Sequence, residues 1–185
     1  MRRLPIVIDT REQMPLDFSD FADVRTERRK LWPGDYSLKA ATCLVAIERK
    51  SVSDLIGTMT TGYAGFNATT PKRFDCELKA MRGYVARGAT AFVLVEPDAF
   101  AFTDAESQIR GGNYRSTIPP DTVLAFIDCI RNGWGVGVVF AESRAHAAEV
   151  VVQTLRAVDA HRQADKAFDR DILAAISKST GARMD

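Results

Sequence analysis

Apolar strands alternate with helices in the second half of this chain, and that alternation limits the folds available to it. The runs TAFVLVEP (90–97) and VGVVFAES (136–143) have the continuous apolar character of buried strands. Helical patterns at 120–133 and 145–161 follow them. Strands connected through helices pair in parallel with right-handed crossovers. The second half therefore predicts the parallel part of a sheet, with helices packed on its faces.

The first half contains a predicted hairpin, which implies an antiparallel part of the same sheet. Strand character is found in LPIVID (4–9), in VRTERRKLW (24–32) and in a hairpin formed by SLKA and CLVAIERK (37–50). Helices are expected at 51–59 and 70–88, and a polar loop at 103–117. The predicted fold class is α/β, with a mixed central β-sheet flanked by helices. We expect one domain over residues 1–160 and a charged C-terminal tail, partly helical or disordered, over residues 161–185.

Composition restricts the possible partners. The net charge of +1 excludes binding to nucleic acid through bulk basicity, so any such binding requires local positive charge. No apolar run has the length of a membrane helix, and the N-terminus has no export signal. The three cysteines lie far apart without a Cys/His cluster, which argues against zinc. We expect a cytoplasmic, nucleoid-associated location in a prokaryote or phage, or a nuclear one in a eukaryote.

The strand ending at residue 50 carries an unusual set of charges. Its apolar start is followed by Glu48, Arg49 and Lys50. Because side chains alternate along a strand, Glu48 and Lys50 share one face and Arg49 points to the other. The hairpin brings Asp35, in the PGDY turn, beside Glu48. Asp9 ends the first strand, so that its carboxylate is a further candidate for the same edge of the sheet.

These side chains indicate metal-assisted hydrolysis of a phosphodiester. Carboxylate oxygens suit Mg²⁺ or Mn²⁺, which also bind substrate phosphate. A lysine beside such a cation orients the attacking water or stabilises developing negative charge. The alternative is a plain ion pair between Glu48 and Lys50, which we consider less consistent with the additional acids Asp35 and Asp9.

The stretches VIDTRE (7–12), GDYSL and VAIERKSVSDLIGTM together resemble the GDx(n)ERKx(3)D signature of the XPF-type structure-specific endonucleases. The resemblance covers about residues 5–157 and implies a restriction-endonuclease-like nuclease core that uses Mg²⁺ or Mn²⁺. By position it implies a catalytic set of Asp9, Asp35, Glu48, Arg49, Lys50 and Asp54, with Asp35, Glu48 and Asp9 as metal ligands. Glu12, Arg11 and Arg73 are the implied supporting residues.

The resemblance also implies a substrate and an assembly. Family members cut flaps, forks or nicked junctions in repair, recombination or replication, and dimerise through the nuclease domain. We therefore expect branched DNA as partner, a homodimer or a heterodimer with an unknown subunit, and no membrane. Only about thirty residues follow the matched region, so the chain is similar to a minimal version without the family's helix-hairpin-helix domain. A non-catalytic DNA-binding subunit, or a nuclease acting on linear ends or duplex DNA, are the alternatives.

Several features have both a functional and an ordinary interpretation. Asp54 is a helix cap or a catalytic residue with similar weight. The loop IRGGNYR (109–115) suits DNA contact through Arg110, Tyr114 and Arg115, although such loops also occur without function. The run ERRK (27–30) is expected to be a solvated strand face, with DNA contact as the second possibility. Trp32 and Trp134 are expected in the core or at an interface rather than as platforms for bases.

Overall fold

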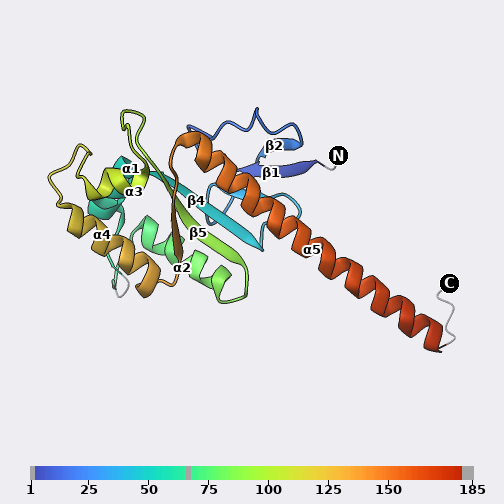
Figure 1. The fold of residues 1–185 in the computed structure, drawn as a ribbon. Coiled ribbons are helices and arrows are strands. Elements are labelled where there is room, and N and C mark those ends of the chain that lie inside the picture. The colour runs from blue at the N-terminus through green and yellow to red at the C-terminus, as the bar shows by residue number, and fades with distance from the viewer. Residues whose placement is uncertain (1–2, 66–67, 181–185) are drawn as a thin grey trace.

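The computed structural model describes residues 3–65 and 68–180, with side chains through Phe168. Its centre is one six-strand sheet in the order β2-β1-β3-β4-β5-β6 (Figure 1). The β1/β2, β4/β5 and β5/β6 pairs are parallel, and the β1/β3 and β3/β4 pairs are antiparallel. This confirms the predicted mixed sheet. The strands are β1 (Leu4–Ile8), β2 (Val24–Arg28), β3 (Tyr36–Leu38), β4 (Val45–Ser51), β5 (Thr90–Glu96) and β6 (Gly137–Phe140).

Helices cover both faces of the sheet. The helices are α1 (Val52–Gly57), α2 (Arg73–Val85), α3 (Ala105–Arg110), α4 (Pro120–Asp128) and α5 (Arg144–Thr180), and one-turn π-helical segments extend α1 and α4 at Thr58–Gly62 and Cys129–Gly133. Val45, Ile47 and Leu94 pack with the first half of α5 in one buried cluster. Ala46, Val93 and Val95 pack with α1 to α4 in a second cluster. Alternate residues of β4 and β5 therefore face different layers.

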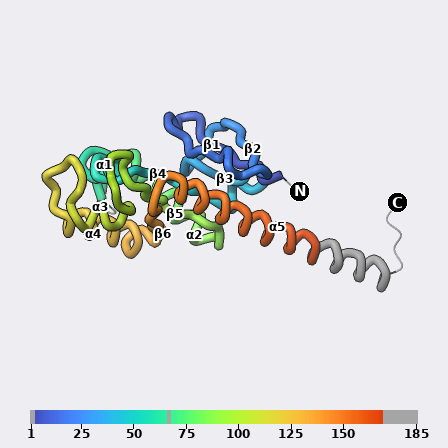
Figure 2. The backbone as a smooth tube through the Cα atoms, turned by 45° about the horizontal axis from the view of Figure 1, so that its top comes forward, coloured from blue at the N-terminus to red at the C-terminus, as the bar shows by residue number. Residues whose placement is uncertain are grey.

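The positions of two helices differ from the predictions. The segment 103–117, predicted to be a loop, contains α3, whose N-cap Asp104 accepts a hydrogen bond from the Ser107 backbone N–H. The polar composition concealed this short helix, because only Ala105, Gln108 and Ile109 are buried. α5 is longer than the predicted 145–161 and continues away from the sheet (Figure 2). The boundary between domain and tail at residue 160 stays a prediction.

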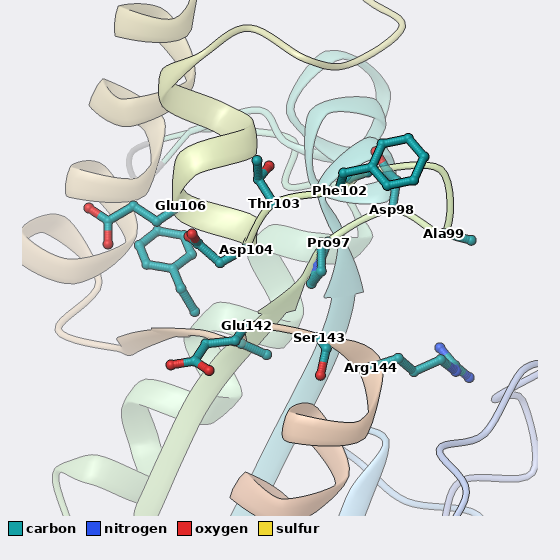
Figure 3. Close-up of a pocket in the computed structure, with 13 residues that line it drawn as sticks. Pro97, Asp98, Ala99, Phe102, Thr103, Asp104, Glu106, Glu142, Ser143 and Arg144 are labelled. Carbon is teal, nitrogen blue, oxygen red and sulfur yellow. The ribbon is translucent and has the colours of Figure 1, made fainter.

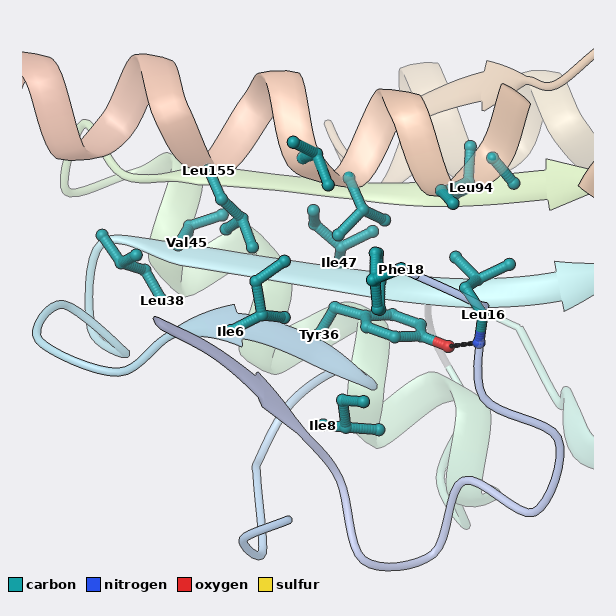
Figure 4. Close-up of a cluster of buried hydrophobic side chains, with 14 of the residues drawn as sticks. Ile6, Ile8, Leu16, Phe18, Tyr36, Leu38, Val45, Ile47, Leu94 and Leu155 are labelled. Atoms are coloured by element: carbon teal, nitrogen blue, oxygen red, sulfur yellow. Dashed lines mark hydrogen bonds between the residues drawn. The ribbon is translucent and has the colours of Figure 1, made fainter. Parts of the chain in front are cut away.

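The cluster beneath α5 fixes the loop that follows β1. Tyr36 is fully buried, and its hydroxyl oxygen accepts a hydrogen bond of 2.8 Å from the Leu16 backbone N–H (Figure 4). Phe18 packs edge-on against the Tyr36 ring, with 5.9 Å between the centroids. These contacts hold residues 9–18 against the end of β3 that carries Asp35.

None of the helices in the described part of the chain combines the length and apolar character needed to cross a bilayer.

Candidate active site

The charges at the end of β4 separate onto two faces as the alternation predicts. Lys50 Nζ donates to Glu48 Oε1 over 3.1 Å, on the side of the sheet covered by α2. Arg49 points to the opposite side, toward the start of α5. The Lys50 ammonium also lies 4.9 Å from the centre of the Phe74 ring, on α2. The ion pair and the ring together hold the ammonium beside the Glu48 carboxylate.

Asp35 reaches the same place through the turn that precedes β3. Its backbone N–H donates to the Ile47 carbonyl oxygen over 2.8 Å, and its Oδ2 accepts from the Arg49 N–H over 2.9 Å. Gly34 allows this approach because its φ is +86° and a Cβ there would lie 3.0 Å from the Ile47 carbonyl oxygen. The Gly-Asp pair of the sequence is therefore a geometric requirement of the turn.

Replacing Gly34 with alanine is expected to lower the free energy of unfolding by about 1–3 kcal/mol, since a side chain at this φ strains the backbone. Gly57→Ala is the matched control. Gly57 lies at the end of α1 with nothing within 4 Å of an added Cβ, so alanine there is expected to be neutral or to stabilise by up to about 1 kcal/mol. Urea unfolding of both variants measures the difference. Equal effects at the two glycines would contradict the assigned role of Gly34.

Burial makes the two carboxyl groups difficult to ionise together. Burial, with a contribution from the Glu12 charge, raises the pKa of Asp35 to about 6. Burial and the nearby Asp35 charge raise the pKa of Glu48 to about 8, against the opposing effect of Lys50. The fold therefore brings two acids together in a position where a positive charge would stabilise their ionised forms.

Arg49 is the centre of a network of ion pairs on the face of the sheet under α5. Its guanidinium donates to both oxygens of Glu12, with Nη2 to Oε1 at 3.0 Å, and to Glu96 Oε1 on β5. Arg144, at the start of α5, also donates to Glu96 Oε1 and to the carbonyl oxygens of Met14 and Pro15. Burial disfavours the Arg49 charge, but the carboxylates outweigh it and raise the pKa of Arg49. Arg49 thus joins β4, β5, α5 and the loop after β1.

Asp9 is fully buried and engaged at both oxygens. Its Oδ1 accepts from the backbone N–H and Nε of Arg11, each over 2.7 Å, and its Oδ2 accepts from the Leu31 N–H. Burial would raise the pKa of Asp9, but these hydrogen bonds prevail and lower it. Asp9 therefore holds the loop 29–35 and Arg11, and its contacts do not favour the predicted role of metal ligand.

The structure also places Asp54 and Arg73. Asp54 is exposed in the first turn of α1, where its backbone N–H donates to the N-cap Ser51 Oγ. Arg73, at the start of α2, is exposed and pairs with Glu77 over 3.1 Å. No contact with Asp35 or Glu48 is found for either residue in the described part of the chain, so their predicted functional roles stay predictions.

Glu77 is a site residue that the sequence reasoning did not identify. It is 3% exposed on α2, and its charge raises the pKa of Glu48 and of Arg11. Glu77 therefore lies near Glu48 on α2, the helix that covers this face of the sheet. The available signal was its position one turn from Phe74 and next to Leu78, within the buried stripe of the helix, where an acid is unusual.

The residues predicted to contact DNA in the loop 109–115 lie beyond the end of β5, with α3. Arg110 pairs with Glu106 on the helix surface, and the Tyr114 hydroxyl donates to the Ile118 carbonyl oxygen. The Arg115 guanidinium lies 5.3 Å from the centre of the Phe100 ring. The structure does not join these three to the Asp35 and Glu48 pair by any contact within the described residues.

A hollow of about 970 Å³ opens at the ends of β5 and β6 rather than at Asp35 and Glu48 (Figure 3). Asp98, Asp104, Glu106 and Glu142 line it, with Arg144 at one side. Such an acidic lining repels phosphate, so this hollow is a poor candidate for contact with a nucleic-acid backbone.

The site suits a divalent cation that has two carboxylates as its protein ligands. Among the described residues, no set of three or more His, Cys, Asp and Glu side chains is arranged to hold a metal ion, so Asp9 does not complete a three-acid group. Asp35 and Glu48 each use one oxygen in the hydrogen bonds described above, and the second oxygen of each bonds to no described residue. Mg²⁺ is commonly held by one or two carboxylates, with water and phosphate completing its shell. The paired acids of raised pKa agree with that donor set.

A carboxylate pair and a lysine at the end of a strand in a mixed, helix-covered sheet define the class of α/β nuclease cores. The family model described as the ERCC4 domain matches residues 8–154, and the chain belongs to this family of structure-specific DNA endonucleases. This confirms the resemblance to the XPF-type nuclease domain.

Two solved structures are similar in fold. XPF from Aeropyrum pernix has 17% sequence identity and a TM-score of 0.58, with 97% of this chain and 75% of that chain covered. The structure of XPF from Aeropyrum pernix in complex with DNA gives the same identity and TM-score over 86% of this chain and 66% of that one. No curated protein sequence matches the chain.

Proposed function

We propose that the protein is a divalent-metal-dependent endonuclease that cleaves flapped, forked or junction DNA. The convergence of Asp35, Glu48 and Lys50 on one face, with acids of raised pKa, is the observation that carries this proposal. Family membership supports the endonuclease class, and the DNA complex of XPF from Aeropyrum pernix supports DNA as the partner. The retained signature charges argue against a subunit that only binds.

The residues divide the chemistry between them. Asp35 and Glu48 would hold Mg²⁺ or Mn²⁺, which polarises the phosphate and lowers the pKa of bound water. Lys50, fixed by Glu48 and Phe74, is positioned to orient the attacking water or to stabilise the charge that develops on phosphate oxygens. Arg49 and Glu12 keep the strand end rigid from the opposite face.

A panel of labelled substrates tests the proposal. Single strand, duplex, 3′ flap, 5′ flap, fork and four-way junction are incubated with Mg²⁺, Mn²⁺ or EDTA, beside Lys50→Ala as control. We expect cleavage of a branched substrate that requires the metal and Lys50. Cleavage of linear duplex or ends alone would replace the substrate proposal, and binding without cleavage under any metal would support a non-catalytic subunit.

The proposed assembly is a homodimer through the nuclease domain, as the family resemblance implies. Light scattering of the purified chain measures it directly. A mass near twice 20.4 kDa is expected, and a mass near 20.4 kDa would exclude the homodimer.

The stability of the metal-free protein is expected to fall as pH rises from about 4 to about 8. Asp35 and Glu48 have ordinary values of 3.8 and 4.5, and folding raises the pKa values to about 6 and about 8. Within this window the folded state binds more protons than the unfolded state, so deprotonation costs stability. Metal binding must release these protons, so Mn²⁺ affinity is expected to rise over the same range.

Thermal unfolding with EDTA or Mn²⁺ at pH 5.5 and 8.5 measures both effects. The double variant Asp35→Asn/Glu48→Gln is the control, because it removes the two titrating groups and leaves all others. A Mn²⁺-induced rise in Tm that is as large at pH 5.5 as at pH 8.5 would contradict the prediction.

A further inference from the structure

A second hollow lies between the loop 29–33, β3 and α2, the helix that covers the face of Glu48 and Lys50. It has a volume of about 250 Å³ and is lined by Arg29, Lys30, Trp32, Ser37, Thr42 and Tyr84 among others. We call it the Trp32 hollow. Its volume is below the ~300–1,000 Å³ of pockets that enclose a whole small ligand. A segment of a larger molecule that passes across it is the better match in size.

The Trp32 hollow is adjacent to the acids in two ways. Ser37 lies two residues after Asp35 at the start of β3, on the same face, and two residues of a strand span about 7 Å. The Arg11 guanidinium lies 5.9 Å from the centre of the Trp32 ring, and its Nε donates to Asp9 Oδ1. The Asp9 backbone N–H in turn donates to the Asp35 carbonyl oxygen over 2.8 Å, so these contacts connect the Trp32 ring to the turn that carries Asp35.

The lining combines positive charge with aromatic rings. Arg29 and Lys30 are exposed and make no ion pair with any described residue, and no acid lines the hollow. The Arg87 guanidinium lies 5.3 Å from the centre of the ring of Tyr84, a lining residue, and so places a third cation next to the lining. Cations along a groove with aromatic rings beside it are the usual features of surfaces that bind single-stranded nucleic acid.

Trp32 lies outside the core. The sequence predicted both Trp32 and Trp134 in the core or at an interface, and Trp134 is buried, with 5% exposure. Trp32 is instead 48% exposed, although its backbone neighbour Leu31 is tied down by Asp9. The loop thus presents a large ring to solvent from a fixed position. Inside a duplex both faces of a base are covered by its neighbours, so an internal base can stack on such a ring only from an unpaired strand.

We propose that the Trp32 hollow binds unpaired nucleotides of the DNA substrate next to the scissile phosphate, with Trp32 stacking on a base and Arg29 and Lys30 contacting phosphates. This inference rests on the proposed function and adds the substrate feature that the site recognises: a single-stranded segment adjoining the cut. It accounts for selection of branched over fully paired DNA by the nuclease core itself.

Binding in EDTA tests the inference apart from cleavage. The probes are a labelled oligothymidylate of about 15 nucleotides and a blunt hairpin duplex, followed by fluorescence anisotropy. Trp32→Ala/Lys30→Ala is expected to weaken binding of the oligothymidylate by roughly ten-fold to a hundred-fold and binding of the duplex by less than about three-fold. Arg25→Ala removes an exposed charge on β2, outside the hollow, and is expected to change neither affinity by more than about two-fold.

Tryptophan fluorescence supplies a second measurement. The chain has two tryptophans, so Trp134→Phe leaves Trp32 as the reporter. We expect oligothymidylate to quench its emission, and the duplex to leave it unchanged. Equal losses on both probes for the double variant, or no quenching in Trp134→Phe, would overturn the role of Trp32. If the wild-type chain cleaves branched DNA while Trp32→Ala/Lys30→Ala binds normally, the hollow proposal fails and the nuclease proposal stands. Absence of both binding and cleavage in the wild type contradicts both.

Discussion

Asp35→Asn is expected to reduce cleavage by roughly 10³-fold or more and, at the same time, to stabilise the metal-free fold. The loss follows because the carboxylate is one of two proposed ligands for the metal. The gain follows because burial raises the pKa of Asp35 from 3.8 to about 6, which corresponds to a cost of up to about 3 kcal/mol at pH 8. Asparagine keeps an oxygen for the Arg49 N–H and removes the charge.

Single-turnover cleavage and thermal unfolding in EDTA measure the two effects. Asp121→Asn is the matched control, since Asp121 is an exposed acid in the first turn of α4. It is expected to leave cleavage unchanged and Tm nearly so. Wild-type cleavage by Asp35→Asn would refute the assignment of the site. A lower Tm for Asp35→Asn in EDTA would refute the account of its electrostatic cost.

Arg49→Leu is expected to lower the free energy of unfolding by about 3–5 kcal/mol. The guanidinium bonds to Glu12 and Glu96, which are both buried. Removing it leaves two buried carboxylates near each other, and only Arg144 remains to pair with Glu96. Burying an uncompensated charge costs more than the pair itself contributes.

Chemical denaturation of Arg49→Leu, Arg49→Lys and Arg110→Leu separates the explanations. Arg110 and its partner Glu106 are both exposed, so the loss of this pair is expected to cost less than about 1 kcal/mol. Lysine at position 49 should recover part of the stability but cannot reach both acids in the same manner. Glu12→Gln combined with Arg49→Leu should be more stable than Arg49→Leu alone. A loss below about 1 kcal/mol for Arg49→Leu would show that the network is not structurally important.

The sequence predicted correctly which side chains meet at the end of β4, because the signals for their placement are local. Alternation along one strand decides that Glu48 and Lys50 share a face, and a Gly-Asp turn decides where Asp35 lies. Residues that arrive from elsewhere in the fold were harder to identify. Glu77 reaches the site only through the packing of α2 on the sheet, and Glu96 reaches Arg49 through the register of β5 on β4.

The exposure of Trp32 and the hydrogen bonds that engage both oxygens of Asp9 could not be predicted from the sequence either. Trp32 has a large apolar side chain of the kind expected in a core, and only the loop held by Asp9 and Arg11 brings its ring to the surface. Asp9 has a carboxylate at the end of a strand, as a metal ligand would, but both of its oxygens accept hydrogen bonds from backbone N–H groups of Arg11 and Leu31. In each case long-range contacts decide the outcome, and no short pattern records them.

The antiparallel pairing of β3 with β4 sets where this chain tolerates insertions and deletions. Tyr36 is paired with Ile47, so hydrogen bonds rather than chain length bring Asp35 to Glu48. Residues 39–44 form the connecting hairpin and can vary in number without moving either acid. One residue gained or lost between Ile47 and Lys50 would instead move the side chains that follow it from the face under α2 to the face under α5, and the reverse. The variable gap in the GDx(n)ERKx(3)D signature therefore falls where length is free, and the contiguous ERK falls where it is not.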